Sequence, residues 1–447
     1  MKNSAQHRSW TLNLGFGPAT AALAIAIAFA VTLAYSQPAQ AQTFTVLYNF
    51  TGGQDGEYPW ASLTMDRGGN FYGTAASGGY FGGNCPYSGC GTVFKLSHKG
   101  SGWVFAPLYL FPGGYDGIGP YARVIFGRDG SLYGTTAEGG NTCYSGTCGT
   151  VFRLAPPATA CKTALCPWNE TVIYRFVGGS DGYQPEGDLT LDQAGNLYGT
   201  TQIGGIPGCS GYSCGTVFEL TPSGGGWTES VLYRFTGYDD GYWPYSGVIL
   251  DQAGNIYGTT SDGGSKSGGG LPQGTAFQLM PSGSGWTKNI LHTFAFSSDG
   301  IIPNGMIFDG SGNLYGTTTA EGNGSGGTVF ELTPSNGNWA FDVLYAFTGN
   351  GGAAGPWNAV TMDAAGNLYG TTRSTGAYGY GVVFKLTPTE TGWTYTSLHD
   401  FTGGADGGWP KSSLIFDANG NIYGTASVGG TGQCDIWGCG VVFEITP

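Results

Sequence analysis

The chain has 447 residues, 85 of them glycine, with 14% aromatic and only 10% charged residues. Disordered glycine-rich chains lack aromatic side chains at this level, and no long segment carries the 3.6-residue apolar period of a helix. The composition therefore predicts an all-β protein of short strands and tight turns. Acidic residues outnumber basic ones by 29 to 16. Without a cluster of lysine or arginine, this negative field argues against nucleic acid and anionic lipid as partners.

The first segment of the chain is typical of a secretory signal peptide. A basic start precedes an uncharged apolar run from about Ala19 to Tyr35, and Ala39 and Ala41 occupy the small-residue positions of a cleavage site. The alternative is an uncleaved membrane anchor, for which the apolar run is slightly short. We predict that residues 1–41 are a signal peptide and residues 42–447 a secreted or extracellular domain without a membrane anchor, a periplasmic location being the alternative.

A tandem repeat fills the rest of the chain. The element Tyr-Gly-Thr recurs at spacings of 61, 65, 59, 58, 54 and 54 residues. Its tyrosines are Tyr72, Tyr133, Tyr198, Tyr257, Tyr315, Tyr369 and Tyr423. Around each copy lie four strand-like segments, in one copy residues 185–192, 196–201, 215–222 and 227–235. Four short strands per repeat, bounded by glycine and proline, are typical of a propeller blade.

The two ends of the domain complete the count of segments. Residues 43–50 match the fourth segment of a repeat and residues 440–447 match the third, so each segment type occurs seven times. We predict a seven-bladed β-propeller with four antiparallel strands per blade, closed by the N-terminal strand joining the C-terminal blade, which leaves no long free edge. An alternative phase would begin each blade with the fourth segment. The longer Gly-Gly-x-Asp-Gly connector better suits a crossing of the whole sheet, so we place the proline-containing segment innermost.

Two motifs carry a resemblance to a known family. Asp-x-x-Gly-Asn-Leu/Ile-Tyr-Gly-Thr-Thr, followed by Gly-Thr-Val-Phe-Lys/Glu-Leu-Thr-Pro, resembles the GloVer (Gloeo/Verruco) tandem repeat of exported bacterial proteins, over residues 42–447. The resemblance implies a propeller-like fold and a surface or secreted location, and it implies no particular activity. The chain departs from anchored members because it stops at a strand without a sorting segment, which favours free release.

The cysteines fall into five pairs, each with four residues between its members. They are Cys85 with Cys90, Cys143 with Cys148, Cys161 with Cys166, Cys209 with Cys214, and Cys434 with Cys439. An even count in an exported chain predicts five local disulfides that stiffen loop tips. Zinc is the alternative, but zinc sites prefer two-residue gaps and converging pairs, and we expect no metal.

The aspartates repeated in each blade are explained by turn chemistry. Those that stand before a Gly-Asn turn, such as Asp192, can accept N–H groups of the turn, and the Asp-Gly pairs, such as Asp181, are ordinary turn residues. Calcium is the alternative reading, for which one acid per blade supplies too few ligands. His292 and His399 replace a tyrosine of the fourth strand, so we interpret them as packing residues. We assign no catalytic residue and no cofactor.

A binding site is predicted where the channel opens, on the face that carries most cysteine loops. The residue after each inner proline differs from blade to blade: Trp60, Tyr121, Glu186, Tyr245, Asn304, Trp357 and Lys411. Aromatic rings stack on sugar faces, and acids or amides bind hydroxyl groups, so these residues suggest a glycan ligand. The alternative is that they only pack between blades.

Two functional classes remain open. The first is a monomeric binding or scaffold module that recognises a polysaccharide or a cell-surface protein. The second is a polysaccharide-acting hydrolase or lyase at the channel mouth, with Glu186 and Asp188 as its nearby acids. Glycosidases place two carboxyl groups on opposite sides of the substrate, whereas these two lie on one strand, so binding is favoured.

Overall fold

The structure is a computed structural model that describes residues 42–446, apart from residues 87, 101, 144–145, 158–167, 206, 210–211, 265–273, 284 and 350–352. The predicted signal peptide lies outside the described residues. So do Cys161 and Cys166, and their predicted disulfide stays a prediction. One compact unit extends from Phe44 to Thr446. Among the described residues, no helix is long and apolar enough to cross a lipid bilayer.

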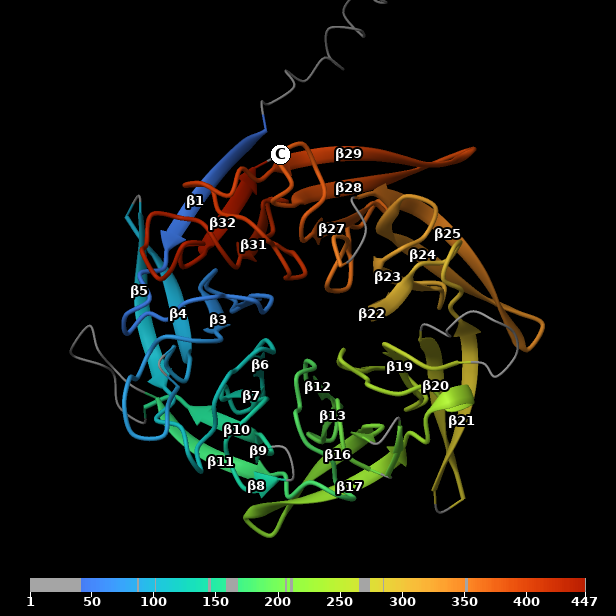
Figure 1. The fold of residues 1–447 in the computed structure, drawn as a ribbon, viewed down its shortest axis with the longest axis horizontal. Helices are drawn as coiled ribbons and strands as arrows, with labels where there is room; N and C mark the ends of the chain where they lie inside the picture. The colour runs from blue at the N-terminus through green and yellow to red at the C-terminus, as the bar shows by residue number, and fades with distance from the viewer. Residues whose placement is uncertain are drawn as a thin grey trace, which may run out of the picture. The chain divides into compact units, whose positions relative to one another are not determined.

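The described residues form seven four-stranded sheets, and these are arranged in a ring as the blades of a propeller (Figure 1). Neighbouring strands within the blades run antiparallel. The all-β class and the seven-bladed architecture predicted from the repeat are therefore confirmed. The remaining described elements are two short ribbons, β8 (Thr142–Cys143) with β9 (Gly146–Thr147) and β14 (Pro207–Cys209) with β15 (Tyr212–Ser213), and the 3-10 turn η1 (Tyr238–Asp240).

Each blade has an innermost, a second, a third and an outer strand. The innermost strands are β2 (Thr64–Met65), β6 (Ile125–Phe126), β12 (Thr190–Leu191), β18 (Ile249–Leu250), β22 (Ile301–Phe308), β26 (Thr361–Met362) and β30 (Ile415–Phe416). The second strands are β3 (Phe71–Ala75), β7 (Leu132–Thr136), β13 (Leu197–Thr201), β19 (Ile256–Thr260), β23 (Leu314–Ala320), β27 (Leu368–Thr372) and β31 (Ile422–Ala426). The third strands are β4 (Thr92–Lys99), β10 (Thr150–Ala155), β16 (Thr216–Ser223), β20 (Thr275–Ser282), β24 (Ser325–Ser335), β28 (Val382–Thr389) and β32 (Val441–Thr446). The outer strands are β5 (Gly102–Leu110), β11 (Asn169–Arg175), β17 (Gly226–Arg234), β21 (Gly285–Thr293), β25 (Asn338–Thr348), β29 (Gly392–Asp400) and β1 (Thr43–Asn49).

Ring closure joins the two ends of the propeller. The last blade has the order β1-β32-β31-β30, so the first strand of the domain completes the sheet made by the last three (Figure 1). Phe44 of β1 packs on Phe443 of β32 with ring centroids 5.5 Å apart, and the fully buried Phe50 follows the strand. This confirms the predicted phase, with the proline-containing segment innermost, and the alternative phase is wrong.

The innermost strands are shorter than the sequence predicts. We expected a strand over residues 185–192, but only Thr190 and Leu191 pair with the second strand. In the other six blades, the first half of the corresponding segment instead offers a carbonyl to the preceding blade. In the next blade, for example, the Ser246 carbonyl accepts a hydrogen bond from the Thr200 hydroxyl at 2.9 Å. The exception is the eight-residue β22.

The threonine of each Tyr-Gly-Thr element joins its blade to the next. Its hydroxyl donates to a carbonyl of the following inner segment at six of the seven junctions. The pairs are Thr74–Ala122, Thr200–Ser246, Thr259–Asn304, Thr317–Asn358, Thr371–Ser412 and Thr425–Ala61. The seventh threonine, Thr135, is buried and its hydroxyl has no partner among the described residues. The repeated threonine therefore supplies the hydrogen bond that seals one blade against the next.

The glycine of the same element makes room for the core of its own blade. A Cβ on Gly199 would lie 2.6 Å from the ring of Phe218, which is fully buried on the third strand. No side chain could occupy that position without displacing the phenylalanine. Each repeat therefore needs glycine opposite phenylalanine.

The repeated aspartates have the structural roles that the sequence predicts. Asp192 accepts backbone N–H groups of its turn, including that of Asn196 at 2.9 Å. Asp181 of an Asp-Gly pair accepts from the Val177 N–H and the Tyr174 hydroxyl. His292 takes the place of that tyrosine in its blade. It contacts Asp299 at 2.9 Å and stacks on the Phe341 ring, so it is a packing residue, as predicted.

Replacing the blade-sealing threonine with valine tests this role, and the chain supplies a matched control. Thr200→Val leaves the Ser246 carbonyl unpaired in the interior, so we expect the free energy of unfolding to fall by about 1–2 kcal/mol. Thr135→Val removes an equally buried hydroxyl that has no partner among the described residues, and we expect no loss of stability, or a small gain. Urea unfolding of both variants measures the difference. Equal losses would show that the inter-blade bond contributes nothing.

Removing residues 42–50 tests ring closure. The deletion takes away β1 and two core phenylalanines and leaves an edge of β32 free, so we expect a loss of at least about 5 kcal/mol of stability. Thermal unfolding followed by circular dichroism measures this loss. A synthetic peptide of residues 42–50 added in trans should restore part of it by strand addition. An unchanged melting temperature would contradict the closure.

Candidate functional site at the channel mouth

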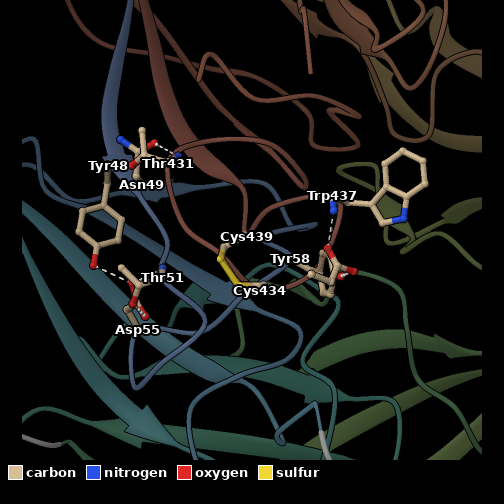
Figure 2. The surroundings of a disulfide bond; sticks show 10 residues. Tyr48, Asn49, Thr51, Asp55, Tyr58, Thr431, Cys434, Trp437 and Cys439 are labelled. Carbon is tan, nitrogen blue, oxygen red and sulfur yellow. Dashed lines mark hydrogen bonds between the residues drawn. A yellow bond between two sulfur atoms is a disulfide. The ribbon is translucent and has the colours of Figure 1, made fainter. Parts of the chain in front are cut away.

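Disulfide-closed loops surround one end of the channel. Cys85–Cys90, Cys143–Cys148 and Cys434–Cys439 are bridged, with Cα–Cα distances of 5.2, 5.4 and 5.2 Å. Figure 2 shows the Cys434–Cys439 bridge beside Tyr58 and Trp437. Three of the five predicted disulfides are thus confirmed as paired.

The other two predicted disulfides are less fully described. Cys214 is disulfide-bonded, as predicted, whereas the side chain of Cys209 lies outside the described residues. Cys161 and Cys166 both lie outside the described residues, so the structure does not test the disulfide predicted between Cys161 and Cys166. Four cysteine loops therefore contribute described residues to the rim of the channel, those of Cys85–Cys90, Cys143–Cys148, Cys434–Cys439 and Cys214.

These loops also hold the next blade. The carbonyl of the second cysteine accepts the N–H of the residue that precedes the next inner proline. The pairs are Cys439–Tyr58, Cys90–Gly119, Cys148–Gln184 and Cys214–Trp243. In the last blade the acceptor is the Tyr380 carbonyl and the donor is the N–H of Trp409. Each of these disulfide loops therefore fixes the backbone at the mouth, which is more than the stiffening of loop tips that the sequence suggested.

Residues of this rim adopt a strained backbone. Tyr58, Gln184, Trp243, Ile302 and Trp409 all have φ between 50° and 58°, in the left-handed region. Such a backbone conformation is unfavourable for residues other than glycine, and it persists only where surrounding contacts hold it. The hydrogen bonds from the cysteine loops supply such contacts at Tyr58, Gln184 and Trp243, and the Tyr380 carbonyl supplies one at Trp409. The rim is therefore rigid rather than adaptable.

Inside the rim, the channel contains a cavity of about 770 Å³. All seven residues predicted from their place after the inner proline line it: Trp60, Tyr121, Glu186, Tyr245, Asn304, Trp357 and Lys411. Trp357 and Tyr245 remain 37% and 40% exposed, so their rings are available to a ligand. The cavity lies within the size range of small-molecule sites.

Asn304 differs from the other six. It is only 6% exposed, and its amide donates to the Thr319 hydroxyl and to the Pro356 carbonyl at 2.9 and 3.0 Å. Tyr315 comes 12 positions after Pro303, whereas the Tyr-Gly-Thr tyrosine comes 13 positions after the inner proline in the other six blades. This deletion moves Asn304 into the position whose carbonyl accepts the blade-sealing hydrogen bond. Its side chain is therefore committed to the wall of the channel.

Lys411 is an amine enclosed by aromatic rings. Its Nζ lies 3.4 Å from the ring centroid of Trp60 and 4.5 Å from that of Trp357. Among the described residues it has no ion pair or hydrogen bond. Burial lowers the pKa of Lys411 to about 7, the nearby Arg373 guanidinium adding to the fall and Glu186 opposing it. The amine of Lys411 is therefore close to its titration midpoint at neutral pH.

Glu186 is the corresponding acid on another side of the cavity. It has no hydrogen-bond or ion-pair partner within the described part of the chain. Burial raises the pKa of Glu186 to about 7, the nearby Glu138 adding to the rise and Lys411 opposing it. The cavity thus holds one acid and one amine, both without direct partners among the described residues and both close to their titration points near neutral pH.

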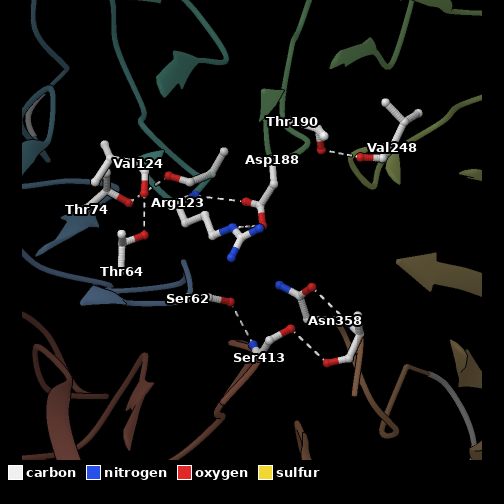
Figure 3. Close-up of polar contacts among 12 residues, drawn as sticks. Ser62, Thr64, Thr74, Arg123, Val124, Asp188, Thr190, Val248, Asn358 and Ser413 are labelled. Carbon is white, nitrogen blue, oxygen red and sulfur yellow. Dashed lines mark hydrogen bonds and ion pairs between the residues drawn. The ribbon is translucent and has the colours of Figure 1, made fainter. Parts of the chain in front are cut away.

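Deeper in the channel the polar groups are paired with one another. The Arg123 guanidinium forms an ion pair with Asp188 at 2.9 Å, and the Arg123 backbone N–H donates to the same carboxylate. The Ser413 N–H donates to the Ser62 hydroxyl across the blade junction (Figure 3). Asp188 is therefore neutralised between two blades. It is not free to act with Glu186 as the second acid of a glycosidase.

Arg373, Trp409 and Trp437 extend the surface of aromatic rings and cations beyond the cavity. These three residues were not predicted from the sequence. Arg373 lies with its guanidinium carbon 4.9 Å from the ring centroid of Trp409 and 5.7 Å from that of Trp357. Trp409 packs on Trp437 of the Cys434–Cys439 loop, with centroids 4.8 Å apart. A signal existed for Arg373, since it is the only charged residue at its position after Tyr-Gly-Thr-Thr/Ala. No group of three or more metal-ligating side chains is found among the described residues.

The closed seven-blade ring with its single repeated motif places the chain in the class of β-propellers built from tandem repeats. The Gloeobacter/Verrucomicrobia repeat model matches residues 32–206, 88–271, 147–355 and 265–447. The chain belongs to the Gloeobacter/Verrucomicrobia repeat family, which confirms the resemblance seen in its motifs. Among curated proteins, none matches the chain significantly.

Solved structures share the fold at low sequence identity. The extracellular domain of a protein described as a one-component system from B. thetaiotaomicron is 11% identical with a TM-score of 0.50, over 90% of this chain and 40% of that one. An aldose sugar dehydrogenase from Streptomyces coelicolor is 13% identical with a TM-score of 0.40, over 91% and 99%. A protein of unknown function from Dyadobacter fermentans is 13% identical with a TM-score of 0.44, over 91% and 98%. At these identities the likeness shows the propeller fold alone.

The charge state of Lys411 can be measured by titration of ¹³C-methylated lysines followed by NMR, with Lys411→Met assigning the resonance. We expect a midpoint near pH 7. Glu186→Gln should lower this midpoint because it removes a negative charge, and Arg373→Met should raise it because it removes a positive one. A midpoint near 10 in the parent protein would contradict the enclosure of the amine.

Proposed function

We propose that this protein is a secreted glycan-binding module whose site is the mouth of the propeller channel. The observation that carries the proposal is the cavity of about 770 Å³ with exposed aromatic rings at its rim and, among the described residues, an unpartnered acid and amine in its wall. Indole and phenol rings offer flat apolar surfaces to sugar rings, and unpartnered polar groups can bind hydroxyl groups. The disulfides around the rim and the export-type sequence start support function outside the cytoplasm.

The rigid rim supports binding as the main activity. Its backbone is held in a strained conformation by hydrogen bonds from disulfide-closed loops, so little conformational freedom is lost when a ligand enters. The pairing of Asp188 with Arg123 leaves Glu186 without a second free carboxylate beside it on its strand. A hydrolase or lyase at this mouth is the alternative, and product analysis of every bound glycan distinguishes it from a binding module.

The test is binding of the purified full chain to an array of bacterial and plant polysaccharides, followed by calorimetry on each hit. Trp60→Ala combined with Trp357→Ala should weaken binding by at least about thirtyfold, since buried aromatic anchors each contribute around 2 kcal/mol. Tyr115→Ala is the matched control, because Tyr115 is a 74% exposed aromatic residue that does not line the cavity. Equal affinities in all three proteins would refute a site at the mouth.

A further inference from the structure

Aromatic rings and cations alternate along one side of the mouth. The order, with each member in contact with the next, is Trp437, Trp409, Arg373, Trp357, Lys411 and Trp60. We call these six residues the mouth arc. They come from three neighbouring blades: Trp357 and Arg373 from the sixth, Trp409, Lys411 and Trp437 from the seventh, and Trp60 from the first. The arc therefore runs from a disulfide loop into the cavity.

The two cations of the arc have no carboxylate partner within the described part of the chain. The Arg373 Nε is buried without a hydrogen-bond partner there, and the Lys411 Nζ lies over the Trp60 and Trp357 rings. The two lie close enough that Arg373 helps to lower the pKa of Lys411. Placing like charges together and away from solvent is unfavourable, and each would be stabilised by an added anion.

Their surroundings make this unpaired positive charge more unusual. The whole chain carries a formal net charge of −13, so carboxylates are plentiful elsewhere on the molecule. Two acids lie near the arc: Asp435 accepts hydrogen bonds from the Tyr58 hydroxyl and the Trp437 N–H, and Glu186 lines the cavity close enough to oppose the fall in the pKa of Lys411. Neither acid forms an ion pair with Arg373 or Lys411 within the described part of the chain.

We propose that the ligand of this site is an acidic oligosaccharide, with one uronic acid carboxylate held between Arg373 and Lys411 and its neighbouring sugar rings stacked along Trp357, Trp409 and Trp437. This inference rests on the proposed glycan-binding function and adds the chemical class of the glycan. A guanidinium and an ammonium form charge-assisted hydrogen bonds to a carboxylate. Trp357 and Trp437 are 37% and 42% exposed, so both rings can receive a sugar face. Asp435, beside Trp437, disfavours a second carboxylate at that end of the arc.

The charges at the site predict the direction of a pH effect. Lys411 is faced by Arg373 and Glu186, and Glu186 by Glu138 and Lys411, while a uronic acid stays ionised throughout the neutral range. Between pH 6 and pH 8 Lys411 loses its positive charge and Glu186 gains a negative one. Both changes weaken the attraction for an anion, so affinity for an acidic glycan should fall over this range.

The experiment compares each acidic polysaccharide with its own carboxyl-reduced form. The probes are polygalacturonate, alginate, hyaluronan and glucuronoxylan, titrated into the purified full chain at pH 6 and pH 8 by calorimetry. We expect at least one acidic form to bind, its reduced form to bind at least about tenfold more weakly, and binding to weaken at pH 8. Lys411→Met should reduce affinity for the acidic form to that of the reduced form, and Lys411→Arg should retain it.

The controls separate this inference from the proposed function. Lys99→Met removes an exposed lysine at the end of β4 and should leave binding unchanged. Thermal unfolding of Lys411→Met should show no loss of stability, because the change removes a buried charge. Equal binding of an acidic polysaccharide and its reduced form would overturn the acidic ligand while leaving glycan binding intact. Binding of neutral glycans alone, or of a polyglutamate peptide alone, would also overturn the acidic ligand. Absence of binding to every glycan would overturn both the acidic ligand and the proposed glycan-binding function.

Discussion

A threonine hydroxyl crosses six of the seven blade junctions, and its hydrogen bond is central to how the channel is built. Its acceptor is usually the carbonyl of the second residue after the inner proline, as in the bond from Thr200 to Ser246. That part of the inner segment is therefore drawn to the preceding blade and pairs with its own blade only from Ile249 onward. The residue between the proline and the acceptor is left to line the cavity. At most junctions the seal between blades and the lining of the channel therefore depend on the same short segment after the inner proline.

The repeat could be predicted because each blade meets the same packing demands. Tyrosine, glycine and threonine recur at fixed positions because each has its own structural role. The tyrosine hydroxyl donates to the turn aspartate, the glycine makes room for a buried phenylalanine, and the threonine hydroxyl bonds to the next blade. Asn304 shows where counting from a proline fails: one missing residue places its carbonyl in the acceptor position, and its amide is bonded within the wall rather than open to a ligand. Arg373 was missed for a different reason, because its contacts with Trp357 and Trp409 involve two inner segments and follow from the ring rather than from one repeat.

The shifted pKa values of Lys411 and Glu186 lower the free energy of unfolding at neutral pH, so these residues have to be explained by something other than stability. A lysine whose pKa falls to about 7 in the folded state binds fewer protons there than in the unfolded chain between pH 7 and its ordinary range. Stability therefore rises with pH across that window and carries the full penalty below it. For Glu186, whose pKa is raised to about 7, the penalty grows from its ordinary range up to pH 7 and is complete above it. Near neutrality neither residue helps folding, so folding does not account for them.

Variation among the seven copies separates the parts of a blade that build the ring from those that are free to bind. The sealing threonine and the buried third-strand phenylalanine are the same in every copy, whereas the residues before and after the inner proline range from glycine to tryptophan and from lysine to glutamate. These variable positions share one end of the channel, where loop carbonyls hold the backbone whatever the side chain. A ligand can therefore be matched by changing side chains at the mouth without altering any bond that closes the ring. Lys411 stands at such a position, after the proline of the seventh blade, and Arg373 stands at another variable position, after the threonines of the sixth. Among the described residues, neither takes part in a bond that closes the ring.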